Sequence, residues 1–481
     1  MSQGGKIMEY DVVIGIENHC ELNTKSKMFS SAPTSFGRKA NSCVNEVDLA
    51  HPGTLPCLNK EAVKKAIEAC TALHLDIDTL IKFDRKNYYY SDLPKGFQIT
   101  QQFHPIGKEG YLDININNET KRIRINRIHM EEDTAKQFHL KDETLVDYNR
   151  AGTPLVEIVT EPDMRNGKEA AAYVEKLRQT LLYLGVSDVK MEEGSLRCDV
   201  NISLKEKGID EFGTKVEIKN LNSIANIQKA IEFEIVRQTE ILENNGKVIQ
   251  STRRFDEATQ TTILMRKKEG NVDYKFFPEP NIFPIRLDSD WVKNIQDNIS
   301  ELPEERYNRY TKEFNLSDYN ANILIANKEL GDYYQEVVKY TDNYLTTSNW
   351  VIGDLQAILS AKNIKLESNP IKAEALAQLM DLINDKTISG KQAKTVFEKM
   401  MDGSMPKDIV EKAGMKQVSD TDSILKLVNE VLDEQPQSIV DFKNGKDRAI
   451  GFLVGQVMKK SRGQANPGLT NKILKEEIEK R

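Results

Sequence analysis

Three separate segments of this chain combine an alternating apolar pattern with charged or polar side chains at the intervening positions. They read Gly-Ile-Glu-Asn-His at 15–19, His-Met-Glu-Glu-Asp at 129–133 and Arg-Cys-Asp-Val-Asn at 197–201. Side chains of a β-strand alternate between its two faces, so Glu17 and His19 share one face, as do Asp199 and Asn201. The pattern therefore predicts sheet strands that carry polar side chains on one face.

Acidic side chains that converge from distant parts of a chain repel one another unless a cation or a substrate offsets their charge. Magnesium prefers oxygen ligands, which Glu17, Glu132 and Asp199 supply, and it accepts a single imidazole such as that of His19. These residues predict a divalent-metal site. The alternative is a set of solvated acids at exposed strand ends, because charged clusters are usually surface features.

The second of these segments contains a change in the alternation. Apolar residues occupy odd positions up to 125 but even positions from 128 onward. This switch predicts a β-bulge near Asn126 and Arg127, and bulges often lie beside functional sites. The bulge leaves Glu132 on the apolar face of its strand, where solvation does not explain a carboxylate.

The order of predicted elements indicates an α+β fold. Strand-like runs and helical patterns alternate up to about residue 284, and the helical patterns include 60–75, 167–184 and 224–242, the last capped by Asn222 and Ser223. A helical series then opens at Pro303. A length of 481 residues suggests about three domains. We predict a large mixed α/β domain at 1–295, a helical domain at 296–368 and a helical tail at 369–481.

Bulk composition narrows the class of protein. The net charge of −7 provides no global basic field, so any contact with nucleic acid must come from local patches. No apolar run approaches the ~20 residues that cross a bilayer, and the amino terminus shows no apolar leader. We therefore expect a cytoplasmic protein without a membrane contact. Five cysteines without a Cys-x-x-Cys pair argue against structural zinc.

Three further segments carry residues suited to binding. Residues 83–96 combine alternating charge with three tyrosines, which favours a loop that lines a pocket or stacks a nucleotide, or else a rigid surface loop. Arg150 lies in a Gly-Pro turn that suits anion recognition, or is a plain turn. Lys215 and Lys219 share a strand face with Glu217 and lead into a helix amino terminus. That arrangement is typical of a phosphate site, or of a capped helix beside an ion-pair ladder.

Several common catalytic motifs are missing from the sequence. No Gly-Lys pair is followed by Ser or Thr, no Gly-x-Gly-x-x-Gly follows a strand, and no nucleophile elbow or amidase-type serine loop is present. If the chain uses ATP, it does so without a common fingerprint. If it uses ammonia, another protein must supply it.

Many of these segments match, in order, the B-subunit family of the bacterial glutamyl/aspartyl-tRNA amidotransferases. The chain resembles that family over nearly its whole length, through the segments 16–27, 51–56, 83–96, 127–133, 149–163, 191–201, 217–223, 273–280, 349–353, 455–458 and 463–467. So many ordered matches make a chance resemblance negligible.

The resemblance implies a heterotrimer. An amidase (A) subunit releases ammonia from glutamine, and a small C subunit clasps the other two. The B subunit binds mischarged Glu-tRNA(Gln) or Asp-tRNA(Asn), phosphorylates the side-chain carboxylate with ATP and Mg²⁺, and lets ammonia displace the phosphate. The implied fold is a large α/β cradle domain, a helical domain and a helical YqeY-like tail that grips tRNA.

The resemblance also assigns roles to residues. It places Glu17, His19, Glu132 and Asp199 at the Mg²⁺ site, with Glu131 beside them, and Lys86 on the ammonia route. Basic residues near the end of the tail suit tRNA phosphates, although they are equally the solvated end of a helix: Lys459, Lys460 and Arg462.

Two departures from the family pattern bear on these assignments. Many members carry zinc-binding cysteines before the Pro-Gly-Thr-Leu-Pro motif, whereas only Cys43 is nearby here, so we expect no zinc. The family's usual Glu-Val-His reads Glu-Asn-His, and Asn18 has the opposite strand parity from the predicted ligands. We therefore expect it to leave the metal undisturbed.

The sequence is also compatible with two other functions. A non-catalytic tRNA-binding scaffold would leave all chemistry to a partner, and a stand-alone metal-dependent hydrolase would act without partner chains. The absence of an amidase nucleophile favours dependence on a partner. The sequence leaves open whether Glu-tRNA(Gln), Asp-tRNA(Asn) or both are substrates, and which residues hold adenine.

Overall fold

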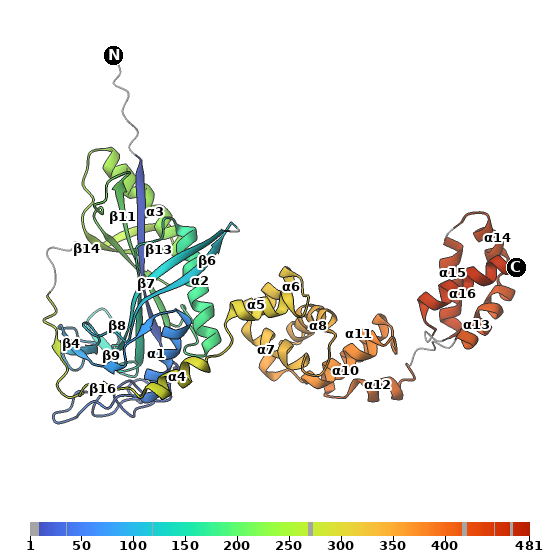
Figure 1. Cartoon of the computed structure of the whole chain (residues 1–481), viewed down its shortest axis with the longest axis horizontal. Coiled ribbons are helices and arrows are strands. Elements are labelled where there is room, and N and C mark those ends of the chain that lie inside the picture. The colour runs from blue at the N-terminus through green and yellow to red at the C-terminus, as the bar shows by residue number, and fades with distance from the viewer. Residues whose placement is uncertain are drawn as a thin grey trace, which may run out of the picture. The chain divides into compact units, whose positions relative to one another are not determined.

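The computed structural model describes residues 9–34, 36–117, 119–267, 273–415, 421–446, 448–461 and 465–481. The chain divides into two compact units, Met1–Pro303 and Glu304–Arg481. The first unit combines β-sheets with helices, and the described residues of the second unit form helices (Figure 1). The predicted α+β fold is confirmed. The finer boundaries at 295/296 and 368/369 stay predictions.

A nine-stranded sheet organises the first unit, in the order β14-β13-β12-β11-β1-β10-β7-β6-β2. Its central strand β1 (Tyr10–Glu21) pairs antiparallel with β10 (Pro154–Thr160) and with β11 (Leu196–Glu206). The remaining strands are β2 (Asp76–Ile77), β6 (Gly107–Ile116), β7 (Glu119–Glu132), β12 (Val216–Leu221), β13 (Ser251–Asp256) and β14 (Thr261–Lys267). Segments far apart in the sequence thus lie beside β1.

The central strands present an apolar face and a polar face. Even-numbered residues such as Ile16, Ile158 and Val200 are buried in a core shared with α1 (Lys60–Ala72), α2 (Gly167–Leu184) and α3 (Ile224–Glu243). Figure 1 shows α2 and α3 beside the sheet, where α2 contacts β6 and α3 contacts β11. Burying each large aliphatic side chain stabilises the fold by about 1.5–3 kcal/mol. The odd-numbered residues are therefore left to the opposite, polar face.

Capping side chains and backbone conformation determine where two of the helices begin and end. Asn222 and Ser223 were predicted to cap α3, and the structure shows that Ser223 is the cap, because its side chain accepts a hydrogen bond from the backbone N–H of Asn226. Helix α1 ends at Ala72, three residues earlier than predicted. His74 adopts a positive φ of 58°, which ends the helical path.

The predicted bulge near Asn126 is also confirmed. Val159 of β10 pairs with Arg127 of β7, whereas the next residue, Thr160, pairs with Ile125. Asn126 is therefore the extra residue, and the alternation of β7 changes face there.

Three smaller sheets lie in the described part of the same unit. One has the order β15-β4-β5, and the others pair β16 with β3 and β8 with β9. Their strands are β3 (Leu80–Ile81), β4 (Asp84–Asn87), β5 (Phe97–Thr100), β8 (Lys136–His139), β9 (Thr144–Asp147), β15 (Phe277–Pro278) and β16 (Ile285–Arg286). Strand β5 packs against β7, which brings the loop between β4 and β5 close to the central sheet.

Helix α4 (Ser289–Asp297) closes the first unit, and α5 (Pro303–Lys312) starts at the predicted proline. The helices that follow are α6 (Asp318–Ala326), α7 (Lys328–Val337), α8 (Tyr344–Trp350), α9 (Gln356–Ala361), α10 (Ala373–Asn384), α11 (Gly390–Lys399) and α12 (Pro406–Lys412). The last four, which share a core around Val428 and Leu453, are α13 (Thr421–Glu434), α14 (Pro436–Lys443), α15 (Arg448–Lys460) and α16 (Pro467–Lys480). Among the described residues, no helix is both long enough and apolar enough to span a bilayer.

The apolar face of β1 contains one misfit, the fully buried side chain of Asn18. Neither polar atom of its amide has a hydrogen-bond partner among the described residues. A buried amide without partners costs about 1–3 kcal/mol.

We expect Asn18→Val to stabilise the protein, because it removes this unsatisfied amide from the core. The melting temperature, measured by calorimetry, should rise by a few degrees. Asn18→Asp is the matched control and should lower it, since a buried charge replaces the amide. A lower melting temperature for Asn18→Val would show that the amide has partners in solution.

Candidate functional site

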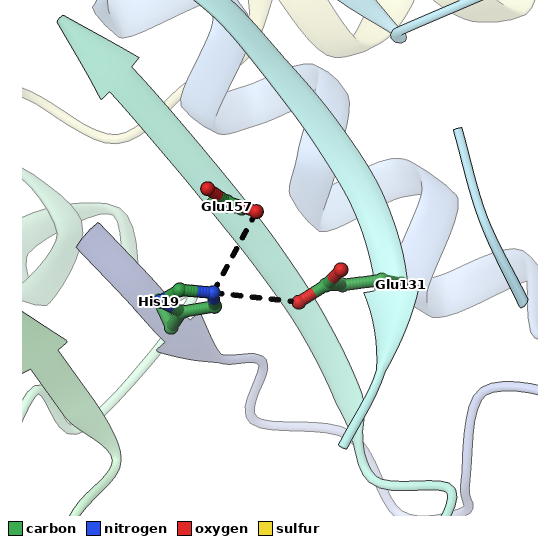
Figure 2. A group of neighbouring side chains, drawn as sticks. All are labelled: His19, Glu131 and Glu157. Carbon is green, nitrogen blue, oxygen red and sulfur yellow. Dashed lines mark ion pairs between the residues drawn. The ribbon is translucent and has the colours of Figure 1, made fainter. Parts of the chain in front are cut away.

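Three adjacent strands bring His19, Glu131 and Glu157 together on the polar face. His19 of β1 pairs with Glu157 of β10, and β10 lies between β1 and β7, which carries Glu131. The His19 Nε2 atom lies 3.7 Å from Glu131 Oε1 and 3.6 Å from Glu157 Oε2. Figure 2 shows the three side chains pointing toward one another. We call them the His19 group.

A second histidine, His129, supports this group. Its Nε2 atom lies 3.1 Å from Glu157 Oε2 and 3.7 Å from Glu131 Oε2. Burial opposes a charge on His129, but the two carboxylates outweigh burial and raise the pKa of the imidazole to about 9. Conversely, burial works against the ionised form of Glu157, yet His129 holds the pKa of that carboxyl well below its usual range.

A second acidic group lies along the same face. Glu17 of β1 pairs with Asp199 of β11, and Glu217 of the next strand, β12, pairs with Asn201. The ligand atoms of Glu17, Asp199 and Glu217 all lie within 4.8 Å of one another. We call these three residues the Glu17 group.

The Glu17 group is only partly neutralised by the protein. The Lys219 Nζ atom lies 2.6 Å from Asp199 Oδ2 and 3.2 Å from Glu217 Oε1. Asn201 donates a hydrogen bond of 2.8 Å to Glu17. Burial and the nearby charge of Glu157 nevertheless raise the pKa of Glu17 above its ordinary value. Lys219 and the more distant Lys215 thus face three carboxylates, so the carboxylates outnumber the ammonium groups that the described residues place near them.

Both groups have the donor chemistry of a divalent-cation site. Each offers carboxylate oxygens from separate strands, which Mg²⁺ and Mn²⁺ prefer, and the His19 group adds one imidazole nitrogen. The strands fix these donors rigidly, and burial strengthens their repulsion in the absence of a cation. The side chains present therefore fit a divalent metal.

The structure separates the residues that the sequence predicted as one metal set. Glu17 and Asp199 lie in one group, while His19 and Glu131 lie in the other. Glu132 pairs with Pro154 and faces the opposite side of the sheet. There its carboxylate forms an ion pair with Lys95 and accepts a hydrogen bond of 3.1 Å from the backbone N–H of Ile99.

Two members of these groups were not predicted as site residues, Glu157 and Glu217. Each is a single acidic residue between apolar neighbours in a strand, Leu-Val-Glu-Ile-Val and Val-Glu-Ile. A single acidic residue in such a strand could have been predicted as a site residue, because a carboxylate inside a buried strand needs a partner. Strand order was needed to show which partners they have.

The predicted binding residues outside the two groups have different surroundings. The Lys86 ammonium lies 4.9 Å from the ring centroid of Tyr274, and its charge helps to lower the pKa of Glu157. Arg150 donates hydrogen bonds of 2.9 Å and 3.2 Å to the carbonyls of Thr134 and Ala135, so its guanidinium holds a loop.

The three basic residues predicted to contact tRNA in the tail also have different surroundings. Lys459 is exposed, whereas Lys460 forms ion pairs with Glu430 and Glu434. Arg462 lies outside the described residues.

Comparison with known proteins identifies the family. The sequence model of the GatB/GatE catalytic domain matches residues 12–293, and that of the GatB domain matches residues 332–478. The chain belongs to the GatB/GatE family. A Bacillus licheniformis protein, named as the B subunit of an aspartyl/glutamyl-tRNA(Asn/Gln) amidotransferase, is 52% identical over 476 residues, covering 98% of this chain and 100% of the relative. Proteins of the same name from Macrococcus caseolyticus and Staphylococcus aureus are 51% identical over 475 residues, with the same coverage.

These matches confirm the resemblance drawn from the ordered motifs. The catalytic-domain match spans both the His19 group and the Glu17 group, and the second match spans most of the helical unit. The two acidic groups of this GatB-family chain therefore lie in the part of the sequence that defines the family's catalytic domain.

The geometry predicts which glutamates bind a cation. Glu157→Gln removes a charge from the His19 group and should weaken Mn²⁺ binding, measured by electron paramagnetic resonance, on the order of tenfold or more. Glu132→Gln is the matched substitution on the other face and should leave the affinity close to that of the unmodified protein. The reverse result would show that Glu132, and not Glu157, binds the metal.

Proposed function

We propose that this chain is the transamidating subunit of an aminoacyl-tRNA amidotransferase. It uses ATP and Mg²⁺ to convert the side-chain carboxylate of Glu-tRNA(Gln), Asp-tRNA(Asn) or both into the amide. The observation that carries the proposal is the pairing of the His19 group and the Glu17 group on one face of a sheet. It is supported by relatives that are named as the B subunit of an amidotransferase.

The proposed chemistry has two balanced steps. A carboxylate oxygen of the aminoacyl group attacks the γ-phosphorus of ATP, and the bond to the bridging oxygen breaks to release ADP. Ammonia then attacks the carbonyl carbon of the acyl phosphate, inorganic phosphate leaves with its electron pair, and the nitrogen loses a proton. The first step is required because a free carboxylate has no good leaving group.

Phosphoryl transfer depends mainly on positioning and on neutralising negative charge. A Mg²⁺ ion held by these carboxylates would supply that neutralisation to the phosphates. The chain's own part is to hold the ligands rigidly. Lys219 keeps Asp199 and Glu217 in place, and His129 does the same for Glu131 and Glu157.

Ammonia must come from another protein on this proposal. The sequence contains no amidase-type nucleophile motif, so a partner A subunit would act as the glutaminase, with a small C subunit completing a heterotrimer. Lys86 lies close enough to Glu157 to affect its pKa, which suits a place on the ammonia route. The exposed Lys459 suits contact with a tRNA phosphate.

The alternative is a scaffold that binds tRNA and performs no chemistry. Carboxylates that repel one another on a half-buried face destabilise the fold, and binding tRNA does not require them. The excess charge of the Glu17 group therefore favours a catalytic role over the scaffold.

Asp199→Ala in the assembled complex tests the proposal. We expect amide formation with free ammonia at saturating Mg²⁺ to fall by at least about a hundredfold, while tRNA binding in a filter assay is retained. Ammonia in place of glutamine removes any effect on the partner glutaminase. Asp297→Ala, at the exposed end of α4, is the matched control. Near-normal turnover of Asp199→Ala would show that Asp199 is not part of the site.

A double variant, Glu17→Gln with His19→Ala, tests the scaffold alternative. If tRNA-dependent ATP hydrolysis by the complex stayed intact in this variant, the scaffold would be favoured.

A further inference from the structure

Thr252 of β13 lies beside the Glu17 group and contacts one of its members directly. Strand β13 runs parallel to β12, and the register places Thr252 opposite Glu217. Side chains at paired positions share one face of a sheet, so Thr252 faces the polar side. Its side chain is buried, with 1% of the residue exposed, and its hydroxyl donates a hydrogen bond of 2.8 Å to Glu217 Oε2. Thr252 therefore reaches the candidate cation site from a strand that supplies none of its carboxylates.

This hydrogen bond helps to fix the orientation of the Glu217 carboxylate. The other oxygen of Glu217, Oε1, lies 3.2 Å from the Lys219 Nζ atom, so each carboxylate oxygen has a partner from the protein. A carboxylate has about four lone-pair sites. The two contacts therefore orient Glu217 toward Glu17 and Asp199 and still leave it able to bind a cation.

The strand itself does not require a hydroxyl at position 252. Valine has the same branched shape as threonine and is as common in strands, and it would fill this buried position without a polar group. A buried hydroxyl destabilises a protein unless it is hydrogen-bonded. The reason for a threonine here is therefore the carboxylate that its hydroxyl contacts.

The opposite face of the same strands contains a matching contact, away from both acidic groups. The hydroxyl of Thr262, in β14, donates a hydrogen bond to the fully buried carboxylate of Glu234, in α3. Arg237 and Arg253 also pair with Glu234, at 2.7 Å and 3.1 Å. This contact joins a helix to the sheet. Thr262 thus offers a buried threonine hydroxyl on a buried carboxylate that belongs to neither acidic group.

We propose that Thr252 is a positioning residue of the cation site, whose hydroxyl holds Glu217 in the orientation that binds the metal. The inference rests on the proposed function and adds to it a residue that touches neither the metal nor the reacting atoms. Removing a residue that orients a metal ligand typically weakens metal binding about 10–100-fold. The main effect of losing the Thr252 hydroxyl should therefore be on metal affinity.

The test measures Mn²⁺ affinity of the assembled complex by electron paramagnetic resonance. Thr252→Val should weaken Mn²⁺ binding on the order of tenfold, and Thr252→Ser, which keeps the hydroxyl, should restore most of the affinity. Thr262→Val is the matched control. It should lower the melting temperature, because buried Glu234 loses a donor, but it should leave the Mn²⁺ affinity unchanged.

A double-mutant cycle shows whether Thr252 acts through Glu217. Glu217→Ala alone should weaken Mn²⁺ binding at least as much as Thr252→Val does. Adding Thr252→Val to Glu217→Ala should then cause little further loss, because the carboxylate that the hydroxyl orients is already gone. A purely structural role of Thr252 would instead produce the full loss in both backgrounds.

The kinetics of amide formation with free ammonia give an independent readout. Thr252→Val should raise the Mg²⁺ concentration that gives the half-maximal rate by a factor similar to the loss of Mn²⁺ affinity. The rate at saturating Mg²⁺ should stay close to that of the unmodified complex, since the metal ligands themselves are intact.

An unchanged Mn²⁺ affinity in Thr252→Val, or equal losses in Thr252→Val and Thr252→Ser, overturns the inference and leaves the proposed function standing. If Thr252→Val does not fold, Thr252→Ala also lacks the hydroxyl and is read in the same way. Amide formation by the unmodified complex without ATP would overturn the proposed function itself.

Discussion

Repulsion among carboxylates on one face of a central sheet is the constraint on which the site depends. The apolar face of β1, β10 and β11 packs on α1, α2 and α3, and this packing fixes which side chains face the other way. Glu17 and Asp199 meet there because their strands are paired residue by residue. The core therefore holds like charges together, and His129 and Lys219 offset only part of that charge. The remaining excess of negative charge suits a divalent cation.

The same alternation separates residues that are adjacent in sequence. Glu131 and Glu132 point to opposite faces, one toward His19 and the other toward Lys95. The bulge at Asn126 determines which residues of β7 face each side of the sheet. Without it, Glu132 would face the His19 group instead. Asn18 lies on the helix-covered face for the same reason. The departure from the family's valine is thus placed in the core and not among the candidate ligands.

Much of the fold could be predicted from local patterns, because periodicity and capping are encoded in neighbouring residues. The extent of α2, the cap at Ser223 and the bulge at Asn126 are all of this kind. The composition of each metal group could not be predicted in this way. Parity places Glu17 and His19 on one face, but only the order of strands decides that Glu17 meets Asp199 and Glu217 while His19 meets Glu157. The role of Lys95 as partner of Glu132 likewise arises from packing between β5 and β7.

Anomalous diffraction from crystals of the assembled complex soaked in Mn²⁺ tests the central claim most directly. We expect a peak on the polar face of the sheet, bounded by His19, Glu131 and Glu157. A peak bounded by Glu132 and Lys95, or no peak within reach of either acidic group at saturating Mn²⁺, would contradict it.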